Sequence, residues 1–319
     1  MRPNRLVLRK VTLCILLITS LIIIAIMSVK TSADEISTYE PKNNGYESPS
    51  TTSSIEAELR EETDAFETRE DKIALLVNYI ELSGVSTSLE NGEVYAPIRF
   101  FAEAMLDCKV RYTESEKMLT VESDGLYIKV ISGKSYIVAN GRYLYLGEEI
   151  TLREDGQFWL PCSTLAMIFG CEYTFDQSTK TANLIPSGEF IENASSYYNS
   201  REVYWLSRII SAESRGEPLL GKLAVGTVVM NRVDSSRFPN SIYDVIFDGR
   251  QFSPAVSGSI YKTPTDESVI AAKIVLEGFR ISEHILFFHS ANPDNYVGFV
   301  NTDKEMLIGR QYYYTYYGK

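Results

Sequence analysis

Apolar residues recur at helical spacing in two consecutive segments of the C-terminal third of the chain. The first segment begins near Tyr204 and places three apolar residues on one face: Trp205, Ile209 and Ala212. Gly216 and Pro218 end this helix, because glycine accepts positive φ and proline disfavours a helical residue before it. A second helix is predicted from about Gly221 to Val233 and is apolar almost all round. The pattern therefore predicts two core helices joined by a tight, charged turn.

Shorter patterns continue to the end of the chain. An amphipathic helix is predicted from Asp266 to Gly278, and Ser241 is positioned to cap a short helix that carries Ile242 and Ile246. Two strands are predicted after these helices, over residues 286–289 and 306–317. The C-terminal part, residues 200–319, should therefore be mainly helical with a small sheet.

An internal repeat occupies the middle of the chain. Tyr95–Tyr112 and Trp159–Phe175 each read as an aromatic strand end, a proline that begins a short apolar helix, and an alternating strand. A polar turn and a further strand follow each copy. Strands are also predicted at Leu126–Ile131 and Tyr136–Val138, with a hairpin turn at Asn140-Gly141. Residues 72–188 should form an α/β repeat domain.

The N-terminal segment has a different composition. Basic residues precede an apolar run from Val11 to Val29, which as a helix is roughly 28 Å long and close to the thickness of a bilayer core. We expect residues 1–33 to be a membrane anchor, with a cleavable signal ending at Ala33 as the alternative. Residues 34–71 resemble a disordered acidic linker, whose last part could continue as a helix into Ile73–Ile80. Overall the fold class is α+β.

Charge and composition narrow the function. The chain has 319 residues and a formal net charge of −11, without a long basic tract outside its first ten residues, which argues against nucleic acid as a partner. Its two histidines and four cysteines make a metal site poorly supported, and we predict no metal and no cofactor. A Cys108–Cys171 disulfide is permitted outside the cell without being required, and a cysteine nucleophile is disfavoured because residues 72–188 contain no histidine.

Glu213 is the most informative single position. It lies in the last turn of the first helix, where the negative end of the helix dipole and partial burial both disfavour ionisation of its carboxyl. Both effects raise the pKa, so Glu213 could stay protonated near neutral pH and donate a proton. The position alone is equally compatible with an exposed glutamate in a charged turn.

Specific motifs surround this glutamate. The run from Ile210 to Pro218, Ile-Ser-Ala-Glu-Ser-Arg-Gly-Glu-Pro, is followed by Val-Val-Met-Asn-Arg-Val up to Val233, and by Arg-Phe-Pro at residues 237–239. With Gln-Phe-Ser at residues 251–253, these motifs resemble the SleB/CwlJ cell-wall hydrolase family over roughly residues 204–314. The middle repeat resembles the domain named after the amino-terminal domain of copper amine oxidases, for which a spacer or a wall-binding role is expected.

The resemblance implies site residues. The first glutamate of the motif, Glu213, is implied to be the catalytic acid of a lysozyme-like domain that cuts the glycan of peptidoglycan. We expect seven residues to bind substrate: Arg215, Glu217, Gln251, Phe252, Ser253, His289 and Tyr296. Tyr296 stands where the family usually has tryptophan, and Gln311 where it usually has histidine, which affects the shape of the groove rather than the acid.

Four functions remain open after this comparison. A lytic transglycosylase needs one acid, whereas a hydrolytic muramidase or glucosaminidase needs a second carboxylate, with Glu217, Asp244 and Asp248 as candidates. A zinc amidase would need about three ligands, and a non-catalytic wall-binding protein none. The expected partners are glycan strands of peptidoglycan, the membrane through the N-terminal helix, and an activating protein whose identity the sequence leaves open. We expect an extracytoplasmic location.

Overall fold

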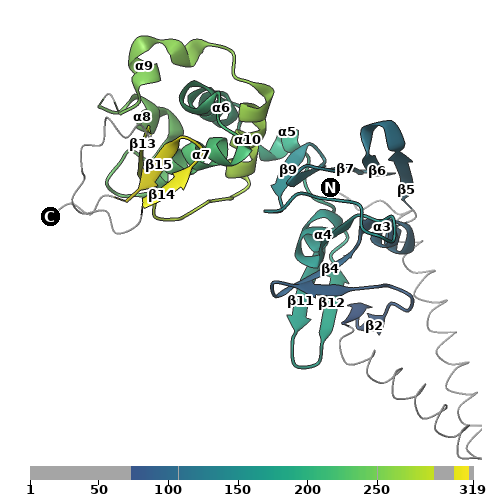
Figure 1. Cartoon of the computed structure of the whole chain (residues 1–319). Coiled ribbons are helices and arrows are strands. Elements are labelled where there is room, and N and C mark those ends of the chain that lie inside the picture. Colours follow the sequence, from purple (N-terminus) through teal and green to yellow (C-terminus); the bar gives the residue numbers. More distant parts are fainter. Residues whose placement is uncertain (1–72, 107, 250, 291–304, 316–319) are drawn as a thin grey trace, which may run out of the picture. The chain divides into compact units, whose positions relative to one another are not determined.

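The computed structural model describes residues 73–106, 108–249, 251–290 and 305–315, all within one compact unit that spans Ala65–Lys319 (Figure 1). The predicted membrane anchor, its alternative as a cleaved signal, and the acidic linker lie outside the described residues. Among the residues that are described, none of the helices has the length and apolar character needed to cross a membrane.

The middle domain consists of strands and short helices in the order that the repeat predicts. Its first copy is β4 (Glu93–Pro97), α3 (Ile98–Leu106), β5 (Lys109–Thr113) and β6 (Met118–Ser123), with a 3-10 turn η1 (Glu114–Glu116) before β6. Its second copy is β10 (Trp159–Pro161), α4 (Cys162–Phe169), β11 (Cys171–Asp176) and β12 (Thr181–Pro186). The rest is β1 (Ala74–Val77), β2 (Ile80–Glu81), β3 (Ser88–Glu90), β7 (Leu126–Ile131), β8 (Tyr136–Ala139) and β9 (Arg142–Tyr145).

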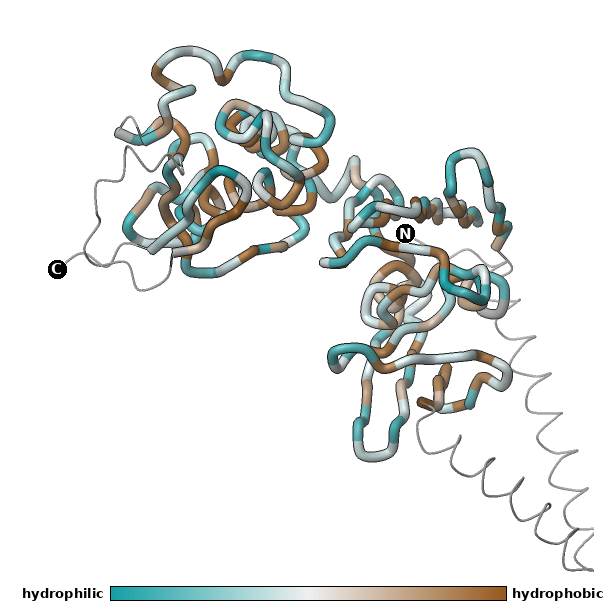
Figure 2. The backbone as a smooth tube through the Cα atoms, in the orientation of Figure 1, coloured by the Kyte–Doolittle hydropathy of each residue, from teal (hydrophilic) through white to brown (hydrophobic). Residues whose placement is uncertain are grey.

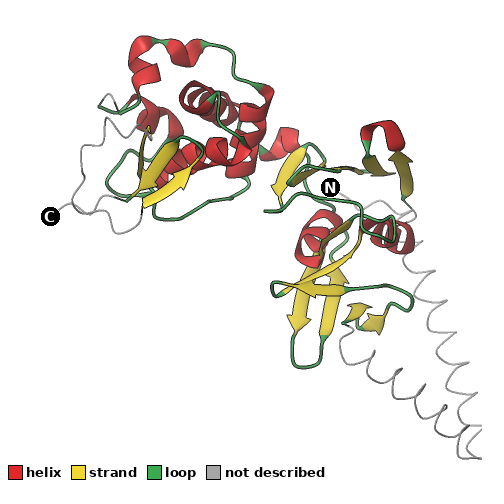
Figure 3. Ribbon diagram, in the orientation of Figure 1, coloured by secondary structure: helices red, strands yellow, loops and turns green. Residues whose placement is uncertain are grey.

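The two copies meet through their sheets and helices. Strands β4 and β10 pair antiparallel, and Phe101 of α3 stacks on Phe169 of α4 with ring centroids 6.1 Å apart. Strand β1 pairs in parallel with β12, so the predicted extension of a helix into Ile73–Ile80 is wrong (Figure 3). The reason is tertiary: Leu75 is buried in the middle-domain core, and the parallel pairing with β12 outweighs the local helix propensity.

Strands β5 to β9 form a five-stranded antiparallel sheet. The predicted hairpin is present, because Asn140 and Gly141 both take positive φ between β8 and β9. The Asn140 side chain also donates to the carbonyls of Gly125 and Ile191, so this turn holds the start of the connection to the C-terminal domain. Cys171 is a free thiol, and the Cys108–Cys171 disulfide is not formed.

The C-terminal domain is built around one helix. The described elements are α5 (Ala194–Tyr197), α6 (Ser200–Ser214), α7 (Leu219–Asp234), α8 (Ile242–Phe247), α9 (Ser253–Ser257), η2 (Ser259–Tyr261), α10 (Asp266–Leu276), β13 (Phe287–Ser290), β14 (Glu305–Ile308) and β15 (Gln311–Tyr314). Figure 1 shows α6 end-on, with α7, α8, α9 and α10 around it, and these helices contact it. The tube in Figure 2 is coloured as hydrophobic where α6 and α7 face each other.

Sequence features explain why these helices begin and pack where they do. The side chains of Asn199, Ser241 and Thr265 cap α6, α8 and α10, each by accepting a bond from a backbone N–H. Gly226 lets α7 approach its neighbours, because an added Cβ would lie 2.9 Å from Val275 of α10 and 3.0 Å from Ile210 of α6. The core helices are therefore as predicted, with ends that shift by a few residues.

The end of the chain differs from its prediction. Instead of one strand, β14 and β15 form a hairpin that turns at Gly309-Arg310, and β15 lies between β13 and β14 in a three-stranded sheet. Tyr313 is fully buried, whereas Tyr312 is only half-buried. Gly309 takes a φ of +58°, a backbone conformation that glycine adopts readily, and this allows the chain to reverse direction here. The alternation of apolar and polar residues did not indicate this reversal.

A contact joins the β8–β9 hairpin to helix α10. Nη2 of Arg142 lies 2.6 Å from Oε2 of Glu277, and the two side chains are only 10% and 7% exposed. The hydroxyl of Tyr198 donates to the same carboxylate, and the ring of Tyr197 lies 3.4 Å from the guanidinium carbon. Tyr145 packs beside Phe279 with centroids 4.5 Å apart. The hairpin thus adds to the core of the C-terminal domain.

We predict that Arg142→Met lowers the free energy of unfolding by about 3–5 kcal/mol, because it leaves the buried carboxylate of Glu277 without its cation. Urea unfolding of the full chain measures this loss. The matched control is Arg99→Met, which removes an exposed i,i+4 ion pair and should cost about 0.5 kcal/mol or less. The double variant Arg142→Met/Glu277→Leu should recover part of the loss, and equal effects of Arg142→Met and the control would contradict the assignment.

Candidate active site

Glu213 lies in the last turn of α6, just before the chain breaks towards α7. Its side chain is half-buried, and burial raises the pKa of its carboxyl from 4.5 to about 7. This is the direction expected for a carboxylate that loses water around its charged form. At neutral pH a substantial fraction of Glu213 is therefore protonated, as a general acid requires.

Glu217 has a different role from Glu213. Its buried carboxylate accepts two bonds from Arg310, one from the backbone N–H to Oε2 and one from Nε to Oε1, both at 3.0 Å. Arg310 belongs to the turn between β14 and β15, so this pair fastens the hairpin to the α6–α7 break. The interaction connects residues 93 positions apart, which is why the sequence did not reveal it.

Glycines allow the chain to pack closely around Glu217. A Cβ on Gly309 would lie 1.9 Å from Oε2 of Glu217, and a Cβ on Gly221 would lie 2.8 Å from its Cβ. Both distances are shorter than side-chain atoms tolerate, so only glycine fits at these positions. Gly309 is doubly constrained, since its φ is also positive.

Besides Arg310, two further residues near the break between α6 and α7 were not predicted from the sequence: Lys222 and Tyr313. The buried ammonium of Lys222 donates to the carbonyl of Glu217 and lies 2.7 Å from Oε2 of Glu267. The hydroxyl of Tyr313 donates to Oε1 of Gln311 at 2.6 Å, and its oxygen also lies 3.2 Å from the Gly221 carbonyl oxygen. Lys222 could have been identified from the sequence, because it is a lysine within an otherwise apolar helix. No sequence feature pointed to Arg310 or Tyr313.

Gln311 links the terminal hairpin to the acid. Its Nε2 donates to the backbone carbonyl of Glu213 at 3.2 Å, so this side chain holds the end of α6. Burial raises the pKa of the Tyr313 hydroxyl, and the charges of Glu217 and Glu213 raise it further. Tyr313 therefore carries a neutral hydroxyl, which is in contact with Gly221 and Gln311.

Some of the predicted substrate-binding residues are exposed, whereas one of them is buried. Arg215 is exposed next to Glu213, and its Nη2 donates to the carbonyl of Thr263 at 2.9 Å. Gln251 and Ser253 are exposed at the start of α9, but Phe252 between them is 2% exposed. Phe252, one of the seven residues expected to bind substrate, is thus part of the core of the C-terminal domain.

Arg232 lies beside the buried ring of Phe252. Its guanidinium carbon lies 4.9–5.2 Å from the ring centroids of Phe238, Phe252 and Phe287, and its Nε donates to the Leu286 carbonyl. Burial lowers the pKa of Arg232 to about 10, so it is still a cation at neutral pH. A cation among three rings is stabilised by their quadrupoles, and it fixes the start of α9 against α7.

His289 lies on β13, beside the tyrosines of β15. Its ring centroid is 5.4 Å from that of Tyr312 and 5.6 Å from that of Tyr314, and its Nδ1 is 2.9 Å from the Ser290 carbonyl. These contacts place His289 in the small sheet, on the strand next to β15. Tyr296 lies outside the described residues.

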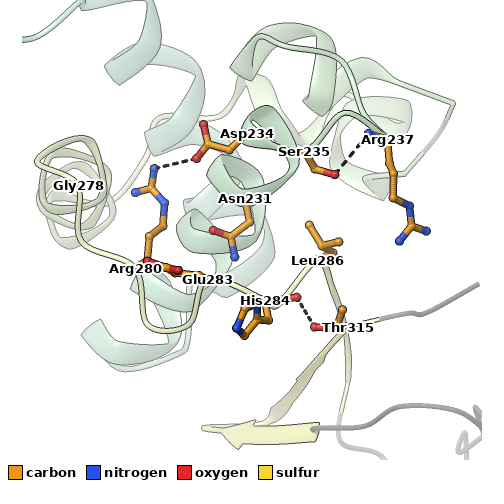
Figure 4. Close-up of a pocket in the computed structure, with 10 residues that line it drawn as sticks. All are labelled: Asn231, Asp234, Ser235, Arg237, Gly278, Arg280, Glu283, His284, Leu286 and Thr315. Carbon is orange, nitrogen blue, oxygen red and sulfur yellow. Dashed lines mark hydrogen bonds and ion pairs between the residues drawn. The ribbon is translucent and has the colours of Figure 1, made fainter.

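A pocket of about 570 Å³ opens at the C-terminal end of α7 (Figure 4). Its lining is largely polar and includes Arg280, which pairs with Asp234 at 3.6 Å, and Thr315, which donates to the His284 carbonyl. None of its lining residues is a predicted catalytic or substrate-binding residue. We therefore regard it as separate from the candidate active site.

Metal ligands are not assembled in the described part of the chain. Within it, no three His, Cys, Asp or Glu side chains come together in a way that could hold a metal ion. Residues 76–184 contain no histidine, and burial raises the pKa of the Cys171 thiol to about 11 and that of Cys162 to about 12. The donor set of the middle domain therefore does not fit copper.

Known proteins match each domain separately. Residues 216–314 match the family described as cell wall hydrolase, and residues 76–184 match the copper amine oxidase N-terminal domain. The spore cortex-lytic enzyme of Bacillus cereus is 35% identical over 102 residues, which are 32% of this chain and 39% of that protein. The spore cortex-lytic enzyme of Bacillus subtilis is 33% identical over 97 residues, which are 30% of this chain and 31% of that protein.

Two solved structures are also similar to part of this chain. The catalytic domain of the Bacillus cereus SleB protein shares 30% identity, with 37% of this chain and 92% of that chain covered and a TM-score of 0.34. The catalytic domain of the germination-specific lytic transglycosylase SleB from Bacillus anthracis shares 30% identity, covering 39% and 100%, with a TM-score of 0.34.

These matches indicate the class of protein that each domain resembles. Residues 216–314 are similar to the cell wall hydrolase family, and residues 76–184 are similar to the copper amine oxidase N-terminal domain. The chain spans about two fifths or less of the length of the curated relatives reported above. The family match begins at residue 216, three residues after Glu213, so the role of Glu213 is argued from its geometry.

We predict that Glu213→Gln stabilises the protein at pH 8 by up to roughly 3 kcal/mol. The folded pKa of about 7 exceeds the usual 4.5, so burial costs stability only where the carboxylate is ionised. The gain should be absent at pH 4, grow between pH 4.5 and 7, and then level off. Urea unfolding across this range measures it, with exposed Glu283→Gln as the control that should show no such trend. A gain independent of pH would argue against a buried acid.

We predict the opposite sign for Glu217→Gln, which should lower the free energy of unfolding by about 1–2 kcal/mol at pH 8. The amide cannot accept both bonds from Arg310 as the carboxylate does. The same unfolding experiment, run beside Glu213→Gln, provides the comparison. Equal stability of Glu217→Gln and the wild type would show that the Arg310 pair does not hold the hairpin.

Proposed function

We propose that the C-terminal domain cleaves the glycan of bacterial peptidoglycan and that Glu213 transfers the proton. The observation that carries the proposal is the half-buried carboxyl of Glu213, with its pKa raised to about 7, at the break between two core helices. The match to the cell wall hydrolase family and the similarity to spore cortex-lytic enzymes support a peptidoglycan substrate. The protein would then act outside the cytoplasm, on spore cortex or vegetative wall.

The finer proposal is a lytic transglycosylase. Protonated Glu213 gives its proton to the oxygen between N-acetylmuramic acid and N-acetylglucosamine as that bond breaks. The resulting carboxylate then takes the proton from the C6 hydroxyl of the muramic acid, whose oxygen closes a 1,6-anhydro ring on the anomeric carbon. The proton returns to Glu213, no water is consumed, and a single acid serves both steps.

The surroundings of the other carboxylates favour this single-acid reaction over hydrolysis. A hydrolytic glycosidase needs a second carboxyl group about 5–9.5 Å from the first. Glu217 is occupied by Arg310, and Asp244 accepts a bond from Ser241 at 2.6 Å as part of the cap of α8. Glu217 and Asp244 therefore each have a structural partner, and Asp248 follows α8 as its C-terminal cap residue.

The remaining alternatives have less support. A zinc amidase would require ligands that do not come together among the described residues. A wall-binding protein without activity would have no use for a carboxyl whose burial costs stability. Attachment to the membrane through Val11–Val29 remains a proposal from the sequence.

We expect Glu213→Gln to lower turnover of purified peptidoglycan by about 10⁴-fold or more, because glutamine keeps the shape but cannot transfer the proton. Wild-type products should carry 1,6-anhydro-muramic ends, lighter by one water than hydrolytic products. Mass analysis of soluble fragments from cortex and vegetative wall measures both.

Glu217→Gln is the matched control for this experiment and should lose less activity, since its carboxylate binds Arg310. If Glu217→Gln is inactive while Glu213→Gln retains most turnover, the acid has been assigned to the wrong residue. If products end in reducing muramic acid, water is the acceptor and Asp244 and Asp248 become the first candidates for a second carboxylate.

A further inference from the structure

Five aromatic side chains gather on the side of α6 that faces α8 and η2, and we call them the aromatic platform: Tyr204, Trp205, Tyr243, Phe247 and Tyr261. Trp205 is at the centre, with ring centroids of the other four 4.9–6.2 Å away. The three tyrosines are 38–60% exposed, so the platform is not closed off from solvent. The neighbouring face of α6 supplies the core through Leu206 and Ile210, and Trp205 itself packs against that core.

Polar groups border the platform. A pocket of about 340 Å³ has Trp205 and Tyr243 in its wall together with Arg201, Glu202 and Asp244. The guanidinium of Arg201 lies 5.3 Å from the Tyr243 ring centroid, and that of Arg208 lies 3.7 Å from the Tyr204 centroid. Aromatic faces beside hydrogen-bonding groups suit a ligand with both apolar C–H surfaces and hydroxyls, which describes a saccharide.

Helix α6 and the segment after η2 connect the platform with the candidate active site. Trp205 precedes Glu213 by eight residues of one helix, which is about 12 Å along the axis. The segment after η2 follows the same helix, since the backbone N–H of Thr265 donates to Oγ of Ser211, and the Thr263 carbonyl accepts from Arg215. A glycan strand that extends from Glu213 can therefore run along α6 and this segment to the rings of Trp205 and Tyr261.

We propose that the aromatic platform binds the glycan strand several sugars away from the bond that is cut. The proposal rests on the function proposed above and specifies how that site holds a long substrate. Sugars near Glu213 occupy the groups at the α6–α7 break, and sugars further along stack on the exposed tyrosines and on Trp205. Long strands should then bind better than short fragments, while the chemistry at Glu213 is unchanged.

The intrinsic fluorescence of Trp205 offers a direct test. The chain has two tryptophans, so Trp159→Phe in the middle domain leaves Trp205 as the only one. In a Glu213→Gln background, which prevents cutting, we titrate the full chain with glycan strands freed of stem peptides. We expect a saturable change in Trp205 emission. Tyr243→Ala/Tyr261→Ala should raise the Kd about tenfold, at about 2- to 12-fold per ring.

Tyr127→Ala is the matched control, because Tyr127 is 42% exposed on β7 of the middle domain, and its Kd should equal that of the parent. Tyr261→Ala alone, at the most exposed ring of the platform, serves if the double variant does not fold, and should raise the Kd about threefold. An unchanged Kd in a folded platform variant, or no emission change with strands, overturns the proposal.

Turnover separates this proposal from the proposed function. With Glu213 intact, the platform variant should keep the wild-type kcat/KM on a tetrasaccharide and lose about tenfold on long strands, through KM. Turnover of long strands that is unaffected by the variant overturns the platform and leaves the function standing. If the wild type cuts no glycan while Trp205 still reports strand binding, the proposed function fails and the platform stands.

Discussion

One buried carboxylate, that of Glu217, holds the candidate active site together. It accepts both of its bonds from Arg310, and Gly221 and Gly309 have no side chain because Glu217 occupies that space. Lys222 adds a bond to the Glu217 carbonyl from the other side of the break. Since the terminal hairpin also reaches the Glu213 carbonyl through Gln311, the position of the acid depends on contacts that Glu217 makes possible.

Glu213 and Glu217 show how burial can have two opposite effects on the same chemical group. Glu217 loses water but gains two N–H donors, so its charge is compensated. Glu213 is half-buried with burial as the cause of its raised pKa, so its charge is costly. Residues 213–217 thus combine a carboxylate that stabilises the site, Glu217, with a carboxyl whose ionised form destabilises it, Glu213. A proton donor at neutral pH needs a carboxyl like that of Glu213.

Helices α6, α7 and α10 and the middle repeat could be predicted because their apolar periodicity is local. The acid could be proposed because its helix ends at Gly216 and Pro218. What failed depends on distant partners. Strand β1 forms only because β12 is there to pair with it, and Arg310 becomes part of the site by binding a residue 93 positions earlier. None of these partners is encoded in a local pattern, whereas the reversal at Gly309 needed knowledge of its φ.

The hairpin that meets α10 has a consequence for how such chains are assembled from modules. The two family matches end and begin more than thirty residues apart, at 184 and 216, as if the domains were independent pieces. Yet Tyr136, Tyr143 and Tyr145 of the middle domain pack against the core of the C-terminal one, and Arg142 neutralises Glu277 there. A recombination event that exchanged the middle domain would leave an apolar surface and an unpaired carboxylate on α10. The two domains should therefore be exchanged only together, because the residues of this hairpin and those at the end of α10 must remain complementary.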